Sequence, residues 1–243
     1  MPDKMRLDKF ICSQRADLSR SDVKLLCRKG RICVNGEVIK SSDFKVSPDI
    51  DTISVDGVET SYKKYIYIML NKPQGVVCST RDGLSPTVLS LVPPELQRKG
   101  LFPAGRLDKD TEGFVLITDD GGLAHRMLSP KSHVPKKYYV ELEHPYEDSY
   151  ADAFRHGITL KTGEQCKPAE FIPCKDKENC CHVVLCEGMF HQVKKMFEAL
   201  GNNVIYLKRI QIGGLHLDEK LPLGECLEIL HKDVDKLTQH FVS

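Results

Sequence analysis

One loop of the sequence places a carboxylate where it could act on a bound molecule. Asp108 ends the run Gly105-Arg106-Leu107-Asp108, and an apolar stretch typical of a buried strand begins at Phe114. A carboxylate on a loop that leads into a strand is held by that strand and can point into a cleft. It could then add to a substrate or stabilise positive charge during a reaction. The alternative is an aspartate that only caps a turn, which is the commoner use of this residue in loops.

A second acid, Asp110, follows two positions later, so a pair of carboxylates could serve a glycosidase-like hydrolysis. We expect Asp108 and Asp110, two positions apart, to point to opposite faces and not toward one substrate. The paired use of these acids is therefore disfavoured. Asp119 and Asp120 precede two glycines, which indicates a turn rather than a metal site.

Two later segments carry further reactive or basic side chains. Tyr138 and Tyr139 are neighbours in an expected strand, so one faces the core side and the other the opposite side. A basic stretch without any acid runs from His125 to Lys137 and contains Lys136. Such a stretch is suited to lie along the phosphates of a nucleic acid.

The start of an expected helix at 192–200 carries four polar side chains. Lys194 and Lys195 could be active groups, or one of them could be purely solvated. His191 and Gln192 could contact a ligand, or they could bond to the backbone near the helix start.

A basic face is expected near the N-terminus. Arg20, Lys24 and Arg28 recur at every fourth position, so they share one face of a helix, and Arg31 follows. Residues 1–40 contain ten Lys or Arg and five Asp or Glu, a balance of +5; the whole chain has +1, so the remainder has −4. A run of charge is usually only a solvated face. The alternative is a patch that contacts phosphates, and charge asymmetry of this kind is typical of a basic recognition module.

The elements that position these residues fall into two parts. Apolar residues at helical spacing begin at Leu7, and Ser19 with Asp22 forms a capping-box pattern for a second helix. Asn35-Gly36 between short apolar runs predicts a hairpin. The polar segment 56–64 predicts a linker.

The rest of the chain mixes strands and helices without regular alternation. Strands are expected at 65–70, 76–78, 114–118, 138–142 and 182–186, and helices at 123–128 and 192–200. This order predicts an α+β fold with a mixed, largely antiparallel sheet. We expect a small N-terminal domain at 1–58, a linker at 59–64 and a larger domain at 65–243.

Composition excludes several classes of protein. Among 243 residues, 41% are hydrophobic, so a sizeable core can form. The N-terminus has no apolar signal region and no apolar run is long enough for a membrane helix, so we expect a cytoplasmic chain that does not bind membranes. Ten cysteines are present, but no C-x2-C pair, so we expect free thiols and no metal.

The N-terminal residues resemble a known module. The runs R-L-D-K-F-I (6–11), L-S-R-S-D-V (18–23) and G-R-I-C-V-N-G-E (30–37) are similar to the S4-type RNA-binding domain, over about residues 5–52. The resemblance implies that the basic face contacts RNA.

Three blocks in the rest of the chain resemble the pseudouridine synthases, and most of all the branch typified by the ribosomal small-subunit (RsuA-type) enzyme. They are G-R-L-D-K-D-T-E-G-F-V-L-I-T-D-D-G (105–121), H-V-P-K-K-Y (133–138) and E-G-M-F-H-Q-V-K-K-M-F (187–197). Together with the N-terminal module, the likeness spans nearly the whole chain and implies an S4-type domain followed by a catalytic domain of the pseudouridine synthase fold.

The resemblance implies a role for each block. Asp108 would be the nucleophile that isomerises a uridine, and Lys194 would be the nearby cation that favours its charged form. Tyr138 would lie against the uracil and help to remove the C5 proton. Arg106 would contact the RNA as the target nucleotide leaves its stack. The expected RNA contacts as a whole are Arg106, Arg20, Lys24, Arg28, Arg31, Lys136, His191, Gln192 and Lys195.

Two positions depart from the family pattern. Met189 stands where Arg or Lys is usual, and its thioether cannot bind a phosphate, although Lys195 could supply that contact. Glu112 stands where a small residue is common. These departures bear on substrate fit rather than on the Asp108, Tyr138 and Lys194 set.

The sequence therefore predicts an RNA pseudouridine synthase that works as a monomer on ribosomal RNA or an assembly intermediate, without metal or organic cofactor. No glycine-rich nucleotide-binding loop is present. Details of the blocks are more similar to enzymes that act on 16S rRNA, which implies uridine 516 as the target. A 23S rRNA enzyme of the same branch is the alternative. A non-catalytic RNA-binding factor in ribosome assembly is a third hypothesis.

Overall fold

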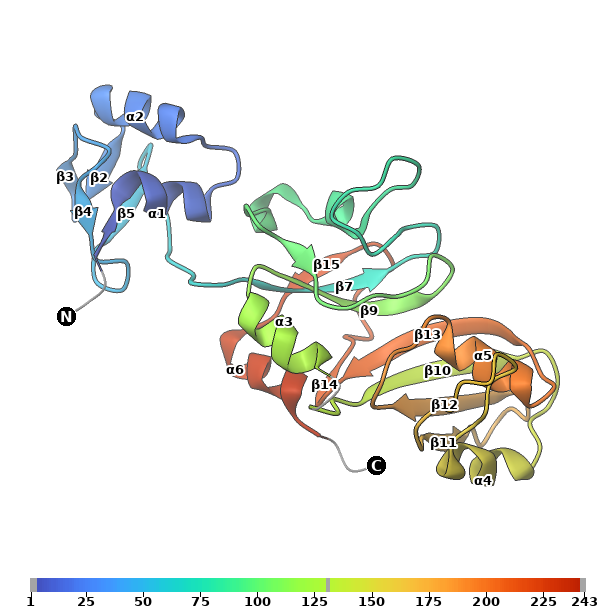
Figure 1. Cartoon of the computed structure of the whole chain (residues 1–243). Helices are drawn as coiled ribbons and strands as arrows, with labels where there is room; N and C mark the ends of the chain where they lie inside the picture. The colour runs from blue at the N-terminus through green and yellow to red at the C-terminus, as the bar shows by residue number, and fades with distance from the viewer. Residues whose placement is uncertain (1–3, 130–131, 241–243) are drawn as a thin grey trace. The chain divides into compact units, whose positions relative to one another are not determined.

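The computed structural model of the chain describes residues 4–129 and 132–240. These residues form two compact units, which Figure 1 shows with their helices and strands labelled. The first unit contains residues 4–66 and 93–101, and the second contains residues 67–92, 102–129 and 132–240. Each unit has its own cluster of buried apolar side chains.

Two helices of the first unit, α1 (Leu7–Gln14) and α2 (Arg20–Arg28), contribute their apolar faces to one core. The side chain of Ser19 accepts a hydrogen bond from the backbone N–H of Asp22 (3.3 Å), and the Asp22 carboxylate accepts one from the backbone N–H of Ser19 (2.8 Å). The expected capping box is therefore confirmed, and it fixes where α2 begins.

The strands of the first unit form two small sheets. They are β1 (Met5–Arg6) paired with β4 (Lys45–Val46), and a sheet of order β3-β2-β5-β6 with β2 (Ile32–Val34), β3 (Glu37–Val38), β5 (Ile53–Val55) and β6 (Val58–Glu59). Asn35 and Gly36 join β2 to β3 with φ values of 52° and 85°. Positive φ at both positions is typical of the type I′ turn that joins two-residue hairpins, and β2 pairs with β3, so the predicted hairpin is confirmed.

The segment expected to be a linker is largely part of the first unit. Asp56 and Gly57 make a second turn with positive φ, which returns the chain to the sheet as β6. Thr60 then donates its N–H to the carbonyl of Ile53 (2.8 Å), and the ring of Tyr62 stacks on Phe10. The polar composition of the segment did not predict these contacts, because only a turn and one aromatic ring hold the segment against the first unit. The domain boundaries themselves remain a prediction.

The second unit is built on one sheet of order β11-β12-β10-β13-β9-β7-β15, with β14 beside β13 and β8 beside β9. Its strands are β7 (Tyr67–Lys72), β8 (Phe102–Pro103), β9 (Glu112–Thr118), β10 (Lys136–Leu142), β11 (Glu170–Pro173), β12 (Cys180–Leu185), β13 (Val204–Ile212), β14 (Leu215–His216) and β15 (Cys226–Glu228). The pairing of β13 with β9 is parallel, and the other pairings are antiparallel. The α+β fold with a mixed, largely antiparallel sheet is confirmed.

Helices cover parts of this sheet (Figure 1). They are α3 (Gly121–Leu128), α4 (Ser149–His156), α5 (Gln192–Ala199) and α6 (His231–Val234), with short 3-10 turns at η1 (Val88–Leu91) and η3 (Asp235–Thr238); η2 (Pro94–Leu96) belongs to the first unit. Phe154 of α4, Phe171 of β11 and Phe197 of α5 pack ring against ring, with centroids 5.2 to 6.4 Å apart. This aromatic cluster fixes α5 on its end of the sheet.

One sequence prediction in this unit was wrong, and another was incomplete. The strand expected at 76–78 is only an isolated bridge between Val77 and Thr87, because the N–H of Ser79 bonds back to the carbonyl of Val77 (3.0 Å) and turns the chain there. Asp120 does more than form a turn: its carboxylate accepts bonds from Leu123 N (2.9 Å) and from the Tyr67 hydroxyl (2.8 Å). It therefore caps α3 and ties that helix to β7.

Candidate active site

Asp108 lies in the segment that joins β8 to β9. Gly105 has a φ of 98°, a conformation that favours glycine, and it turns the chain toward Asp108. Thr111 donates its N–H to the carbonyl of Asp108 (3.1 Å), which closes a turn. The Asp108 side chain keeps 26% of its surface exposed and lines a cleft of about 620 Å³. The acid is therefore held by its backbone and open to a ligand at its carboxylate.

Lys72 of β7 holds this turn from inside the protein. Its side chain is 0% exposed, and its ammonium donates to the carbonyls of Pro73 (3.0 Å), Lys109 (3.3 Å) and Thr111 (2.8 Å). Burial lowers the pKa of Lys72 from its ordinary value. A buried cation is tolerated here because carbonyl dipoles surround it. Its contacts fix the backbone on both sides of the turn that follows Asp108.

Arg209 of β13 holds the same segment at its two ends. Its Nε donates to the carbonyl of Phe114 (2.8 Å) and its Nη1 to the carbonyl of Arg106 (3.3 Å). β13 can approach this closely because residue 113 is a glycine: a Cβ on Gly113 would lie 2.2 Å from the Arg209 carbonyl oxygen. The glycine of the first sequence block thus allows the close pairing of β9 with β13.

The two acids of the first block are separated, but not for the reason expected from sequence. Asp108 and Asp110 lie in a turn rather than a strand, so alternation along a strand does not apply. Asp108 lies 3.5 Å from Nε2 of His191, whereas both carboxylate oxygens of Asp110 accept bonds from Lys194 (2.6 Å). The two carboxylates therefore have different partners.

Lys194 was expected beside Asp108, and the structure places its ammonium on Asp110 instead. This bond lowers the pKa of Asp110. The reason is local: Asp110 is the more exposed of the two acids, and α5 brings Lys194 to that side of the turn. Asp108 is two residues away along the same turn.

Tyr138 of β10 faces the cleft that Asp108 lines. Its ring is 8% exposed, and its strand neighbours in the pairing are Val183 and Arg209. Tyr139 points to the opposite face of the sheet, where its hydroxyl donates to Glu141 (2.7 Å). The alternation of the two tyrosines is as the sequence predicted.

Lys136 lies two positions before Tyr138, on the same face of β10, and also lines the cleft. Its ammonium donates to the carbonyl of Val134 (3.0 Å). Burial and, to a smaller extent, the charge of Arg209 lower the pKa of Lys136 to about 8. Lys136 is therefore a cation at the wall of the cleft whose charge is sensitive to pH.

The loop from 187 to 191 forms another wall of the cleft. Gln192 is buried, and its side chain accepts a bond from Met189 N (2.9 Å) and donates to Glu187. Glu187 also accepts a bond from the N–H of Lys167 (3.0 Å). Gln192, an expected RNA contact, also lines the cleft, and both ends of its side-chain amide hold this loop.

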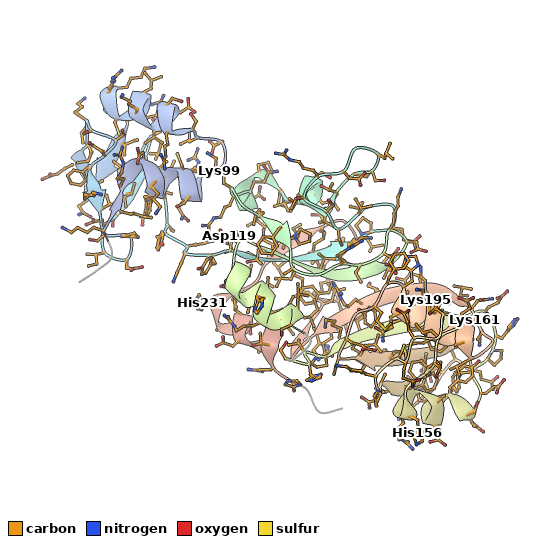
Figure 2. All side chains as sticks on the ribbon, viewed as in Figure 1. Lys99, Asp119, His156, Lys161, Lys195 and His231 are labelled. Atoms are coloured by element: carbon orange, nitrogen blue, oxygen red, sulfur yellow. The ribbon has the colours of Figure 1, made fainter. Side chains whose placement is uncertain are left out.

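The remaining expected RNA contacts of the second unit are at the surface. Arg106 is exposed at the cleft, and His191 lines it between Asp108 and the loop. Lys195 projects from α5 (Figure 2), and its ammonium lies 5.2 Å from the ring centroid of Phe190. The structure thus gathers Arg106, Asp108, Lys136, Tyr138 and His191 at one cleft, with Lys194 and Lys195 on the adjoining helix.

In the first unit, Arg20, Lys24 and Arg28 are all exposed on α2; we call these three residues the α2 basic face. Arg20 and Lys24 line a shallow depression of about 370 Å³. Arg31 is exposed too, but its guanidinium pairs with Asp56, which leaves it less available to a phosphate than the α2 basic face.

Two residues that shape the site were missed in the sequence. Lys72 and Arg209 gave no signal as site residues, because the carbonyls they bind lie 37 and 39, or 95 and 103, positions away in the chain. The run Lys72-Pro73-Gln74-Gly75 indicated only a turn. Their role is visible only once the strands are paired, because both cations then bind backbone carbonyls of the segment that carries Asp108.

Within residues 4–129 and 132–240, no three His, Cys, Asp or Glu side chains gather as metal ligands would. In the same residues, no helix has both the length and the apolar character needed to cross a membrane.

Comparisons with known proteins agree with this architecture. The family described as RNA pseudouridylate synthase matches residues 66–199, and the S4 domain matches residues 5–49. A solved structure, described as a pseudouridylate synthase, superimposes with a TM-score of 0.67 at 40% identity and covers 96% of this chain and 99% of its own.

Curated relatives are similar over almost the full length. An uncharacterized RNA pseudouridine synthase of Bacillus subtilis is 41% identical, over 97% of this chain and 99% of its own. The ribosomal small subunit pseudouridine synthase A of Haemophilus influenzae is 42% identical, over 97% and 100%. The protein of the same name from Yersinia pestis is 44% identical, over 95% and 97%.

Proposed function

The chain belongs to the RNA pseudouridine synthases of the RsuA type, and from this premise we propose that it isomerises uridine 516 of 16S ribosomal RNA, with Asp108 as the nucleophile. The observation that carries the proposal is the placement of Asp108: a fixed turn presents its carboxylate to the cleft that Tyr138 also lines. The proposal includes a monomer working in the cytoplasm, where ribosomes are assembled.

The reaction moves one bond of the nucleotide without any net oxidation. The bond between N1 of uracil and C1′ of ribose breaks, a bond between C5 and C1′ forms, C5 loses a proton and N1 gains one. A carboxylate can assist by adding covalently to the sugar or the base, or by stabilising positive charge on the sugar. Asp108 has this role in the proposal.

Tyr138 and Lys194 complete the proposed catalytic set. The hydroxyl of Tyr138 is suited to help remove the C5 proton, because its ring faces the cleft and a uracil could lie against it. Lys194 supplies positive charge near the turn. Because Asp110 and Asp108 are two residues apart, a small movement of the long lysine side chain would bring its charge from one acid to the other.

RNA contacts come from both units in this proposal. At the cleft, Arg106, Lys136 and His191 are positioned to meet the target nucleotide and its phosphates. Lys195 adds charge beside the cleft. In the first unit, the α2 basic face and Arg31 would contact the RNA backbone.

The choice of 16S rRNA is supported by the relatives. Three bacterial proteins with 41–44% identity over at least 95% of this chain are called ribosomal small subunit pseudouridine synthase A. A 23S rRNA enzyme is the second candidate, since the departures at Met189 and Glu112 affect residues near the cleft and the sheet behind it. Family membership speaks against the non-catalytic assembly factor.

The test is to map pseudouridines in the ribosomal RNA of cells that lack the gene. The proposal expects loss of one pseudouridine, at position 516 of 16S rRNA, and its return when the wild-type gene is restored. Loss at a position in 23S rRNA would replace the 16S proposal with the second candidate. A complete set of rRNA pseudouridines in the deletion strain would contradict both.

A further inference from the structure

Phe190 stands out at the rim of the cleft. It lies between β12 and α5, lines the cleft with Asp108 and Tyr138, and keeps 67% of its surface exposed. Single exposed apolar residues are common on protein surfaces. Exposure alone would therefore say little, and the neighbours of the ring decide its meaning.

The ring of Phe190 is held in place rather than left free. The imidazole of His191 stacks on it with centroids 3.8 Å apart and an angle of 21° between the planes. His191 itself has a φ of 55°, a left-handed conformation that costs free energy for a residue with a side chain and often occurs at functional sites. The bond from Met189 N to Gln192 fixes the backbone on the other side. An exposed aromatic ring is thus presented in a defined orientation.

The distance of Phe190 from the reacting atoms is also defined. His191 has Phe190 stacked on its ring and the carboxylate of Asp108 3.5 Å from its Nε2. The target ribose has to reach Asp108, so Phe190 is one ring farther out along the wall of the cleft. A ligand group lying on Phe190 would therefore belong to the nucleotide next to the target.

A uridine that enters the cleft has to leave its stack in the RNA, and its neighbour then loses a stacking partner. An aromatic side chain can replace that partner, whatever the neighbouring base is. We propose that Phe190 is the stacking platform for the base adjacent to the target uridine. The ammonium of Lys195 lies over the ring, 5.2 Å from its centroid; it would give up this place to the base and bring positive charge to the phosphate of the same nucleotide.

This inference rests on the family activity and not on which uridine is modified. The experiment therefore uses a short RNA that the wild-type enzyme modifies, together with a second RNA in which the nucleotide adjacent to the uridine lacks its base. The 5′ and 3′ neighbours are each removed in turn. If the 16S assignment fails, the RNA is chosen from whichever site the enzyme modifies, so the two failures are distinguishable.

The variants separate stacking from simple loss of an exposed side chain. Phe190→Ala removes the ring, Phe190→Tyr keeps it, and Phe190→Leu keeps apolar volume without an aromatic face. Ile205→Ala is the matched control, because Ile205 of β13 is 62% exposed and takes no part in the proposed site. Thermal unfolding is measured for each variant.

On intact RNA, Phe190→Ala should lower kcat/KM by about 5- to 100-fold, the range expected for one lost base–aromatic stack. Phe190→Tyr should stay near wild type, Phe190→Leu should fall between, and Ile205→Ala should not change. For one of the two neighbours, the kcat/KM of the wild type on the abasic RNA should equal the kcat/KM of Phe190→Ala on intact RNA. Phe190→Ala should show no further loss of kcat/KM on that abasic RNA.

Independent effects would overturn the proposal. If Phe190→Ala lowers kcat/KM by the same factor on intact RNA and on both abasic RNAs, the ring does not stack on a neighbouring base. Equal rates for Phe190→Ala and wild type on intact RNA would overturn it as well. So would a loss of activity that Phe190→Tyr does not restore and that accompanies a lower unfolding temperature.

Discussion

The lysines and arginines of the two units have different roles, although they are the same residue types. In the second unit, Lys72 and Arg209 are buried, and their donors bind the backbone carbonyls of the segment that carries Asp108. In the first unit, the α2 basic face is exposed to solvent. Burial therefore separates cations that shape the protein from cations available to an RNA backbone.

Lys194 and Lys136 lie between these extremes. The side chain of Lys194 is partly exposed and is paired with Asp110, and Lys136 is half-buried at the wall of the cleft. If burial decides the role of each cation, substituting a buried cation should lower stability, and substituting a partly exposed one should affect the chemical step or RNA binding at the cleft. Substituting an exposed cation should lower only RNA affinity. The following four substitutions test that order, from the largest expected effect to the smallest.

Lys72→Met should lower the free energy of unfolding by about 3 kcal/mol, because it leaves buried carbonyls without a donor. Denaturant unfolding measures this effect. Lys109→Met is the matched control, since Lys109 is exposed and its ammonium donates an exposed hydrogen bond to the Ser85 hydroxyl. Equal stability of Lys72→Met and wild type would contradict the structural role given to the buried cations.

Lys194→Met should lower kcat by about 100-fold, the size expected when one electrostatic group is removed from a transition state. Single-turnover formation of pseudouridine measures the chemical step. Asp110→Asn removes the acid that Lys194 binds in this structure but leaves the lysine. If both variants lose the same activity, Lys194 acts by holding Asp110 and not through Asp108.

Lys136 should give RNA binding a pH dependence, because the pKa of Lys136 is lowered to about 8. As pH rises from 7 to 9, the ammonium loses its charge and RNA affinity should fall by up to about tenfold, the loss of one phosphate contact. Lys136→Arg keeps its charge over this range, so its affinity should not show this fall. A wild-type profile identical to that of Lys136→Arg would show that Lys136 does not contact RNA.

The sign of the stability effect at Lys136 is opposite. The folded-state pKa lies below the ordinary value for lysine, so between about pH 8 and 10.5 the unfolded chain binds more protons. The contribution of this group to the free energy of unfolding should therefore rise with pH across that window, relative to Lys136→Met. Affinity and stability should thus change in opposite directions.

Replacing the α2 basic face by alanine should weaken RNA binding by a salt-dependent amount without changing kcat. Each phosphate contact to single-stranded RNA contributes about 0.7 to the slope of log affinity against log salt concentration. Loss of three contacts should therefore reduce the magnitude of that slope by about 2. A variant with the same change in net charge, at three exposed lysines of the second unit, is the control: Lys161, Lys177 and Lys232. Equal slopes for both variants would remove the α2 basic face from the RNA interface.

Local signals predicted much of this molecule. Ser19 and Asp22 predicted the start of their helix, Asn35 and Gly36 predicted their hairpin, and the period of two along β10 predicted that Tyr138 and Tyr139 lie on opposite faces. In each case the interacting residues are within a few positions of one another, so the physical cause is visible in the sequence. The family resemblance, not the period, indicated that Tyr138 is the one at the cleft.

Contacts between distant segments could not be predicted in the same way. The family resemblance implied that Lys194 lies beside Asp108, but the structure pairs its ammonium with Asp110. The geometry of the turn decides between the two acids, and residue spacing does not specify that geometry. The role of Arg209 depends on the parallel pairing of β13 with β9 and on the missing side chain of Gly113. Such roles become visible only when the strands are paired.

The central claim concerns the chemistry of one carboxylate, and the pair Asp108→Asn and Asp110→Asn tests it most directly. Each protein is mixed with an RNA that the wild type modifies, and pseudouridine formation and RNA affinity are measured together. The account predicts that Asp108→Asn binds RNA normally but forms pseudouridine more than about 10³-fold more slowly, whereas Asp110→Asn remains active. Pseudouridine formation by Asp108→Asn at the wild-type rate would contradict it.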